Sequence, residues 1–136
     1  MANSEQASYS PGPRRILIVD DSSLVRLYYR ETLEKAGFAT DQAINGIEAM
    51  EKVLAQPFDL VIVDVNMPRM DGFSFLRTLR RAAPEVATLP ALMITTEAAE
   101  QGVGEARAGG ANFYLVKPVS EADLLRHAAI LTGAPP

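Results

Sequence analysis

Five short segments rich in apolar residues alternate along the chain with five longer segments whose apolar residues recur every three or four positions. Short apolar runs are typical of β-strands, and the longer spacing is typical of amphipathic helices. The pattern predicts strands over residues 15–20, 39–43, 60–64, 91–95 and 112–116. It predicts helices over residues 22–36, 46–56, 72–83, 98–108 and 120–132, and Pro84 is expected to end the third of them. This alternation indicates an α/β domain in which helices cover both faces of a parallel sheet.

The predicted strands differ in polarity, and this difference indicates their order. Residues 16–19, 60–63 and 91–94 are apolar throughout, as expected for strands that are covered on both faces. Residues 39–43 are polar and fit an edge strand. We therefore expect a doubly wound, flavodoxin-like (βα)5 sheet of five parallel strands in the order 2-1-3-4-5. In this order the binding crevice opens between the first and third strands.

Two of the predicted helices carry specific signals. The fourth contains Gly102 and Gly104, and each glycine costs about 1 kcal/mol relative to alanine inside a helix. A marginal helix beside a functional edge is a candidate for movement. The first helix has one face with the spacing of a buried surface, made of Val25, Tyr28, Tyr29, Thr32, Leu33 and Ala36.

Length and composition fit one globular domain. The chain has 136 residues, a formal net charge of −4 and no cysteine, so disulfides and thiolate metal sites are excluded. No apolar run approaches the ~18 residues that a membrane span needs, no secretory signal is visible, and the acidic balance argues against nucleic-acid binding. We expect a cytoplasmic monomer whose folded domain covers residues 14–132, between a flexible tail over 1–13 and a C-terminal tail over 133–136.

Polar side chains stand where four of the predicted strands end. The carboxyl ends of parallel strands meet at one edge of an α/β sheet, and such folds bind their ligands there. We therefore expect carboxylates, a hydroxyl and an ammonium group to share this edge. The residues are Asp20 and Asp21 after the first strand, Asp64 at the end of the third, Thr95 at the end of the fourth and Lys117 after the fifth.

Three carboxylates held close together repel one another and need a proton or a cation as compensation. Oxygen ligands without histidine or cysteine favour a hard cation, and Mg²⁺ suits a site with one or two carboxylates and a phosphate oxygen. The backbone carbonyl of Asn66 is a further candidate ligand. An aspartate can also act as a nucleophile and form an aspartyl phosphate. Lys117 and Thr95 are placed to meet the charge of such a phosphoryl group.

Each of these residues has a simpler interpretation when it is taken alone. Asp20 or Asp21 can cap a helix, Asp64 can be a loop acid, and Lys117 can be a solvated lysine. These interpretations weaken when the residues are combined, because all of them fall at strand ends. His127, the one histidine in the chain, has no second imidazole nearby in sequence, so we interpret it as a packing or solvated residue.

Four segments resemble the receiver domain of bacterial response regulators. They are Asp20-Asp21-Ser22, Asp64-Val65-Asn66-Met67-Pro68-Arg69-Met70-Asp71-Gly72, Leu92-Met93-Ile94-Thr95 and Tyr114-Leu115-Val116-Lys117-Pro118. The resemblance covers residues 14–132, and the second segment is most similar to the stand-alone, CheY-like regulators of chemotaxis. It implies a single-domain response regulator that takes part in two-component phosphorelay signalling.

The resemblance also implies how the phosphoryl group and the metal are bound. Asp64 is the phosphoacceptor, and Lys117 meets the phosphoryl group. Asp21 and Asp64 bind Mg²⁺ directly together with the backbone carbonyl of Asn66, while Asp20 acts through water.

Further residues of the resemblance concern switching and the lifetime of the phosphoryl group. Thr95 and Tyr114 are the switch residues, and Lys117-Pro118 is expected to be a cis peptide. Asn66 and Glu97 are expected to position the water that attacks the phosphoryl group, which makes self-dephosphorylation fast.

The resemblance implies a histidine kinase or a phosphotransfer protein as the phosphodonor. A downstream target protein is expected on the face made of the fourth helix, the fifth strand and the fifth helix. Two residues depart from the frequent pattern: Thr96 is bulkier than the usual alanine and partly shields the phosphoryl group, and Val119 replaces a frequent phenylalanine on the output side.

Three alternative functions use the same fold. An Mg²⁺-dependent phosphohydrolase with an aspartate nucleophile needs a second acid two residues later, where this chain has Asn66. Flavin binding needs a phosphate loop after the first strand, where Asp20 and Asp21 would repel phosphate. A receiver can also act as a phosphate sink or shuttle without a target. We expect a signalling module rather than an enzyme.

Overall fold

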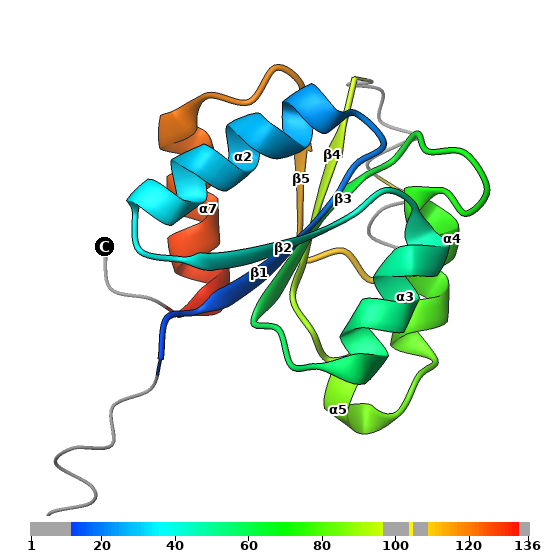
Figure 1. The fold of residues 1–136 in the computed structure, drawn as a ribbon. Coiled ribbons are helices and arrows are strands. Elements are labelled where there is room, and N and C mark those ends of the chain that lie inside the picture. The colour runs from blue at the N-terminus through cyan, green and yellow to red at the C-terminus, as the bar shows by residue number, and fades with distance from the viewer. Residues whose placement is uncertain (1–11, 97–103, 105–108, 134–136) are drawn as a thin grey trace, which may run out of the picture.

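Five parallel strands form one sheet in the order β2-β1-β3-β4-β5 (Figure 1). The computed structural model describes residues 12–96, 104 and 109–133. The fold class and the strand order predicted from the sequence are both confirmed. The strands are β1 Arg15–Val19, β2 Ala39–Ala43, β3 Leu60–Asp64, β4 Ala91–Thr95 and β5 Phe113–Val116.

Helices cover both faces of the sheet. One face carries α2 (Ser23–Lys35) and α7 (Glu121–Thr132), and the other carries α3 (Gly46–Ala55), α4 (Gly72–Arg80) and the short α5 (Pro84–Ala87), as Figure 1 shows. The helix predicted over 98–108 lies outside the described residues, apart from Gly104. The same holds for residues 1–11 and 134–136 of the two predicted tails.

The predicted C-terminal end of the third helix was wrong. The sequence predicted a helix over 72–83 that Pro84 terminates, but α4 ends at Arg80 and Pro84 begins α5. Proline suits the first position of a helix, because its N–H would have no partner there and its φ is already helical. Pro84 therefore starts a helical turn that the sequence pattern did not predict.

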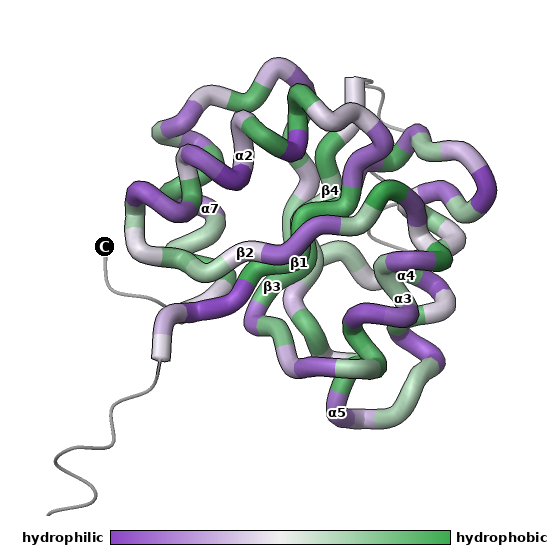
Figure 2. The backbone as a smooth tube through the Cα atoms, viewed as in Figure 1, coloured by the Kyte–Doolittle hydropathy of each residue, from purple (hydrophilic) through white to green (hydrophobic). Residues whose placement is uncertain are grey.

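The core consists of two clusters, one on each face of the sheet. Because successive residues of a strand face opposite sides, Leu17 and Val19 of β1 pack with α3 and α4, whereas Ile16 and Ile18 pack with α2 and α7. Figure 2 shows the hydrophobic colour along the central strands. Burial on both faces explains why these strands are apolar throughout.

The same alternation decides the face on which the strand-end residues lie. Asp64 continues the row of Leu60 and Ile62, which belongs to the α2 and α7 side. Thr95 continues the row of Ala91 and Met93 on the α3 and α4 side, and Tyr114 packs against that second cluster. Thr95 and Tyr114 therefore share one face, and Asp64 lies on the other.

The predicted buried face of the first helix is too wide. Tyr29, Thr32 and Leu33 of α2 are buried, but Tyr28 is 39% exposed and Ala36 is exposed as well. Tyr28 sits at the margin of the helix–sheet contact, where its hydroxyl donates to the carbonyl of Val119. The spacing thus identified the face and overestimated its width.

The packing interpretation of His127 is confirmed. The ring is buried in α7 and meets the ring of Phe113 edge-on, with 4.4 Å between ring centroids. Its Nδ1 lies 2.7 Å from the carbonyl oxygen of Asp123, one turn earlier in the helix. These contacts give His127 a structural role on the α7 side of β5.

Candidate functional site

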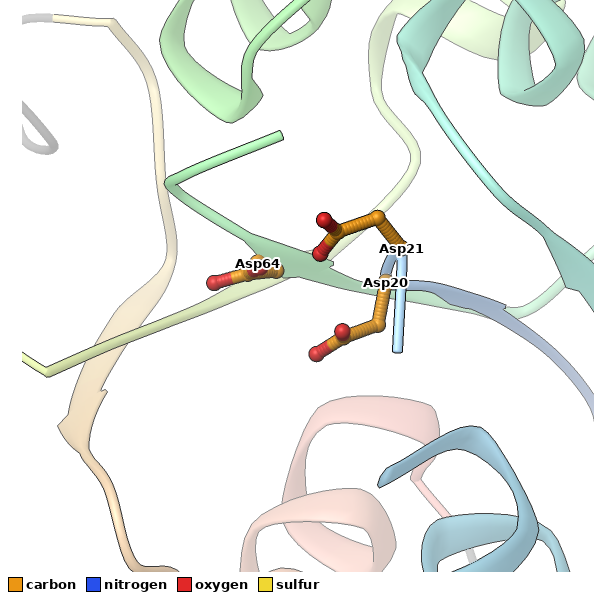
Figure 3. Close-up of side chains that lie close together, drawn as sticks. All are labelled: Asp20, Asp21 and Asp64. Carbon is orange, nitrogen blue, oxygen red and sulfur yellow. The ribbon is translucent and has the colours of Figure 1, made fainter. Parts of the chain in front are cut away.

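Asp20, Asp21 and Asp64 bring three carboxylates around one space at the carboxyl edge of the sheet (Figure 3). One oxygen atom from each lies within 4.8 Å of the other two. The arrangement follows from the topology, because β1 and β3 are neighbours with Val19 beside Val63. Asp20 and Asp64 are buried, and Asp21 is exposed. The structure brings together the acids that the sequence placed at this edge.

Every polar atom of Asp20, in its side chain and its backbone, forms a hydrogen bond. Its Oδ1 accepts a hydrogen bond from the backbone N–H of Ser22 at 2.9 Å, and its Oδ2 accepts one from Lys117 at 3.1 Å. Its own N–H donates to the carbonyl of Ala43 at 3.1 Å. Its carbonyl accepts from the guanidinium of Arg26 at 2.7 Å. A buried carboxylate with this many donors is fixed in place, as burial of a charge requires.

Lys117 reaches two of the three acids from the segment after β5. Its Nζ lies 3.1 Å from Oδ2 of Asp20 and 3.5 Å from Oδ1 of Asp64. Burial by itself lowers the pKa of the ammonium, but the hydrogen bond and the charge of Asp20, together with the charge of Asp64, outweigh it and raise the pKa of Lys117. The site therefore holds a firmly protonated lysine.

The pKa of Asp64 is raised from 3.8 to about 6. Burial is the main cause and the charge of Asp20 is the second, while the ammonium of Lys117 and the N–H of Asn66 act in the opposite direction. Burial, followed by the charges of Asp20 and Asp64, also raises the pKa of Tyr29. Burial is the first cause of both shifts, and the negative charge of the neighbouring acids is the second.

The residues fit a hard divalent cation. The cluster offers carboxylate oxygens only, which is the ligand type that Mg²⁺ prefers. Among residues 12–96, 104 and 109–133, Asp21 makes no ion pair, so one carboxylate of the cluster is available to a metal. Asn66 lies beside Asp64, because its N–H donates to Oδ1 of Asp64 at 3.4 Å. Its backbone carbonyl as a ligand stays a prediction.

A family model for the response regulator receiver domain matches residues 16–129. The chain belongs to this family. The resemblance inferred from the sequence is thereby confirmed, and the three aspartates form the acidic pocket typical of a receiver magnesium site.

Several known proteins resemble this receiver domain along most of its length. The chemotaxis protein CheY-3 of Vibrio cholerae is 41% identical over 111 residues, which are 81% of this chain and 85% of that protein. The sensor protein EvgS of Escherichia coli is 37% identical over 119 residues, which are 88% of this chain and 10% of that protein. A solved structure of the chemotaxis protein CheY4 of Vibrio cholerae gives a TM-score of 0.84 at 37% identity, covering 88% of this chain and 99% of that one.

Family membership decides between a signalling domain and an enzyme. The chain is a CheY-like signalling receiver and not a conventional enzyme, as the sequence predicted. None of the helices in the described part of the chain is long and apolar enough to cross a membrane.

The structure places the remaining predicted residues of the receiver domain as follows. Thr95 is buried at the end of β4, and its carbonyl accepts from the N–H of Lys117 at 2.6 Å. Tyr114 is half-buried in β5. The peptide between Lys117 and Pro118 is cis, as predicted. Glu97 lies outside the described residues.

Sequence reasoning missed two residues of α2 that flank the receiver site. Arg26 binds the carbonyl of Asp20, and its Nε also donates to the side chain of Gln42 at 2.9 Å. Tyr28 binds the carbonyl of Val119 at 3.0 Å. Both side chains bind backbone carbonyls, and no residue spacing in the sequence signals such a contact.

Proposed function

We propose that this receiver domain is phosphorylated on Asp64 by a histidine kinase or a phosphotransfer protein, in the presence of Mg²⁺, and that phosphorylation switches a protein-binding surface. The observation that carries the proposal is the Lys117 ammonium, which lies within 3.5 Å of both Asp20 and Asp64. A lysine so placed can neutralise negative charge on a group attached to Asp64. Phosphoryl transfer needs this kind of positioning and neutralisation more than it needs a base.

For the metal, we assign Asp21, Asp64 and the backbone carbonyl of Asn66 as direct ligands, with Asp20 acting through water. When bound, Mg²⁺ offsets the charge of the carboxylates and of the phosphoryl oxygens. Asp21 is suited to this role because it is exposed at the mouth of the site.

In the transfer itself, a carboxylate oxygen of Asp64 forms a bond to phosphorus while the phosphorus–nitrogen bond of the donor histidine breaks. Near neutral pH the acid is mostly ionised, since its pKa is about 6, so it is ready as a nucleophile. Lys117, which contacts Oδ1 of Asp64 at 3.5 Å, needs only a small movement to meet a phosphoryl oxygen instead.

The switch would run through the opposite face of the sheet. Thr95 adjoins the site at the end of β4. Tyr114 packs on the same face of the sheet as Thr95, the face that α3 and α4 cover. When Thr95 turns toward a phosphoryl oxygen, the space next to it becomes available to Tyr114. The surface that changes adjoins β5 and α7, and there we place the contact with a downstream protein.

Labelling with a small phosphodonor tests the proposal. The protein incubated with phosphoramidate and Mg²⁺ is expected to gain one phosphoryl group on Asp64, located by mass spectrometry of the peptides, and to gain none in chelator. In Asp21→Ala, the Mg²⁺ concentration for half-maximal labelling should rise at least ~10-fold, because losing even a group that only supports a ligand costs about that much.

Asp71→Asn is the matched control for Asp21→Ala. It removes a carboxylate from the same rim, while asparagine caps a helix as well as aspartate does, so the cap of α4 on the N–H of Ser74 is kept. Labelling on another residue, or labelling that is independent of Mg²⁺, would contradict the proposal.

The phosphoryl group is expected to be short-lived, because Asn66 and Glu97 are assigned to hold the attacking water. Asn66→Lys should slow the decay of phosphorylated protein roughly 10-fold, since loss of alignment at a reacting centre can cost up to ~100-fold. Thr96→Ala, which removes bulk beside the site, should change the decay by no more than about twofold, since the shielding effect is the smaller one. An unchanged decay rate in Asn66→Lys would show that this residue does not position the water.

A further inference from the structure

Tyr28 of α2 contacts the segment that carries Lys117. Its hydroxyl donates a hydrogen bond of 3.0 Å to the carbonyl of Val119, 91 residues away in sequence. Figure 1 shows this segment, drawn in orange between β5 and α7, passing beside α2. The bond therefore links a helix that begins at the acid pocket to the segment that delivers the lysine.

Few other contacts fix the backbone of this segment. At its start the N–H of Lys117 donates to the carbonyl of Thr95, and after its end Ser120 caps α7 by accepting from the N–H of Asp123. Within the described part of the chain, Tyr28 makes the one side-chain hydrogen bond to the backbone of residues 117–119.

Packing does not fully support this segment on the side of α2. An open pocket of about 480 Å³ lies there, with Val25, Tyr28 and Tyr29 on one side and Lys117, Pro118 and Val119 on the other. The Val119 side chain is buried in the core cluster below. The position of the backbone above the pocket thus depends on the Tyr28 bond to a greater extent than it would in a filled interior.

We propose that Tyr28 is a positioning residue for Lys117, and this inference rests on the function proposed above. By holding the carbonyl of Val119, the hydroxyl of Tyr28 restricts where the flexible lysine side chain places its ammonium. That ammonium sits at 3.1 Å from Asp20 and 3.5 Å from Asp64. A looser segment would let it drift from the phosphoryl site, and small misplacements of a stabilising charge slow a reaction strongly.

The neighbouring tyrosine provides a matched control. Tyr29 also lines the pocket, and its ring lies 5.6 Å from that of Tyr28. In the described part of the chain, no hydrogen bond to the hydroxyl of Tyr29 is present, whereas Tyr28 binds Val119. Replacing either residue by phenylalanine removes one hydroxyl from the same pocket and keeps the ring.

The first experiment compares labelling rates with phosphoramidate at saturating Mg²⁺. Tyr28→Phe is expected to be about threefold to tenfold slower than the unchanged protein, which is the range for loss of one hydrogen bond. Tyr29→Phe should stay within about twofold, since it loses no such bond. Thermal unfolding followed by circular dichroism shows that both variants are folded at the assay temperature. Equal rates for Tyr28→Phe and the unchanged protein would overturn the proposal.

A double-mutant cycle separates positioning from general loosening of the fold. In a Lys117→Met background, which has no ammonium to position, Tyr28→Phe should cause no further decrease in the labelling rate. If Tyr28→Phe slows labelling by the same factor with and without Lys117, it does not act through the lysine and the proposal fails. If the unchanged protein is not labelled at all, it is the proposed function that fails.

Discussion

Gly72→Ala is expected to lower the free energy of unfolding by about 3 kcal/mol and to slow labelling of Asp64 roughly 100-fold. A Cβ atom at this position would lie 2.5 Å from the carbonyl oxygen of Asp64 and 2.9 Å from Cα of Val65. Both neighbours are backbone atoms, so no side-chain rotation relieves the contact. The strand end that carries Asp64 has to shift instead.

A hydrogen bond adds to the effect of the clash. The N–H of Gly72 donates to the carbonyl of Val65 at 3.0 Å, which closes the loop between β3 and α4. Moving the two backbones apart strains this bond together with the position of Asp64. Stability and labelling should therefore fall together in this variant.

Urea unfolding and labelling with phosphoramidate measure the two effects. Gly12→Ala is the control, because a Cβ there meets no atom within 4 Å. Its stability and labelling should match those of the unchanged protein. If Gly72→Ala has the same free energy of unfolding and the same labelling rate as the unchanged protein, the close approach of Gly72 to the backbone of Asp64 and Val65 is not required.

The central strands were predictable because burial on both faces leaves a signal in every residue. Residues 16–19, 60–63 and 91–94 are apolar throughout and form the inner three strands β1, β3 and β4. The polar strand β2 was placed at an edge for the complementary reason, and it lies there.

The hydrophobic pattern of the sequence could not predict very short helices or the width of a helix's buried face. The helix α5 has four residues, fewer than are needed to show a helical period, so Pro84 was interpreted as an end instead of a beginning. Periodicity also gives the direction of a buried face but not its width. That is why Tyr28 was predicted to be buried although it is 39% exposed.

The acid pocket was predictable for a topological reason, whereas the residues around it were not. Parallel strands bring their carboxyl ends to one edge, so Asp20 and Asp64 had to meet once the strands were placed. Arg26 and Tyr28 act on the carbonyls of Asp20 and Val119. Contacts to backbone atoms depend on the three-dimensional path of the chain and leave no pattern in residue types.

Asp64→Asn is expected to abolish labelling and, at neutral pH, to stabilise the metal-free protein. Asparagine has no carboxylate to attack phosphorus, so the first effect is complete loss. The second follows from the pKa of Asp64, which burial and the charge of Asp20 raise to about 6 from 3.8. The folded protein therefore binds this proton more tightly than the unfolded chain does.

The sign of the pH dependence follows from that difference. Well below pH 3.8 the carboxyl is neutral in both states, and it costs no stability there. Between about pH 4 and pH 6 the unfolded chain ionises this acid while the folded protein retains its proton, so the free energy of unfolding falls, and it levels off above pH 6 where both states are ionised. A shift of about two pKa units corresponds to a loss of about 3 kcal/mol. The neutral asparagine of the variant avoids this loss.

Urea unfolding in chelator at pH 4 and pH 7.5 measures the effect. The variant and the unchanged protein should be similar at pH 4, and the variant should be the more stable by about 2 to 3 kcal/mol at pH 7.5. Glu51→Gln, which neutralises an exposed acid on α3, should show no such difference between the two pH values.

Adding Mg²⁺ at pH 7.5 should reverse the order of stability. A metal that binds the folded state stabilises it by mass action, and the unchanged protein retains all three carboxylates for binding while Asp64→Asn does not. If the variant is instead less stable than the unchanged protein in chelator at pH 7.5, the contacts of Asp64 with Lys117 and with the N–H of Asn66 stabilise the fold more than the crowding of acids destabilises it. The pocket would then be a structural ion-pair network, with no excess of negative charge to attract a metal.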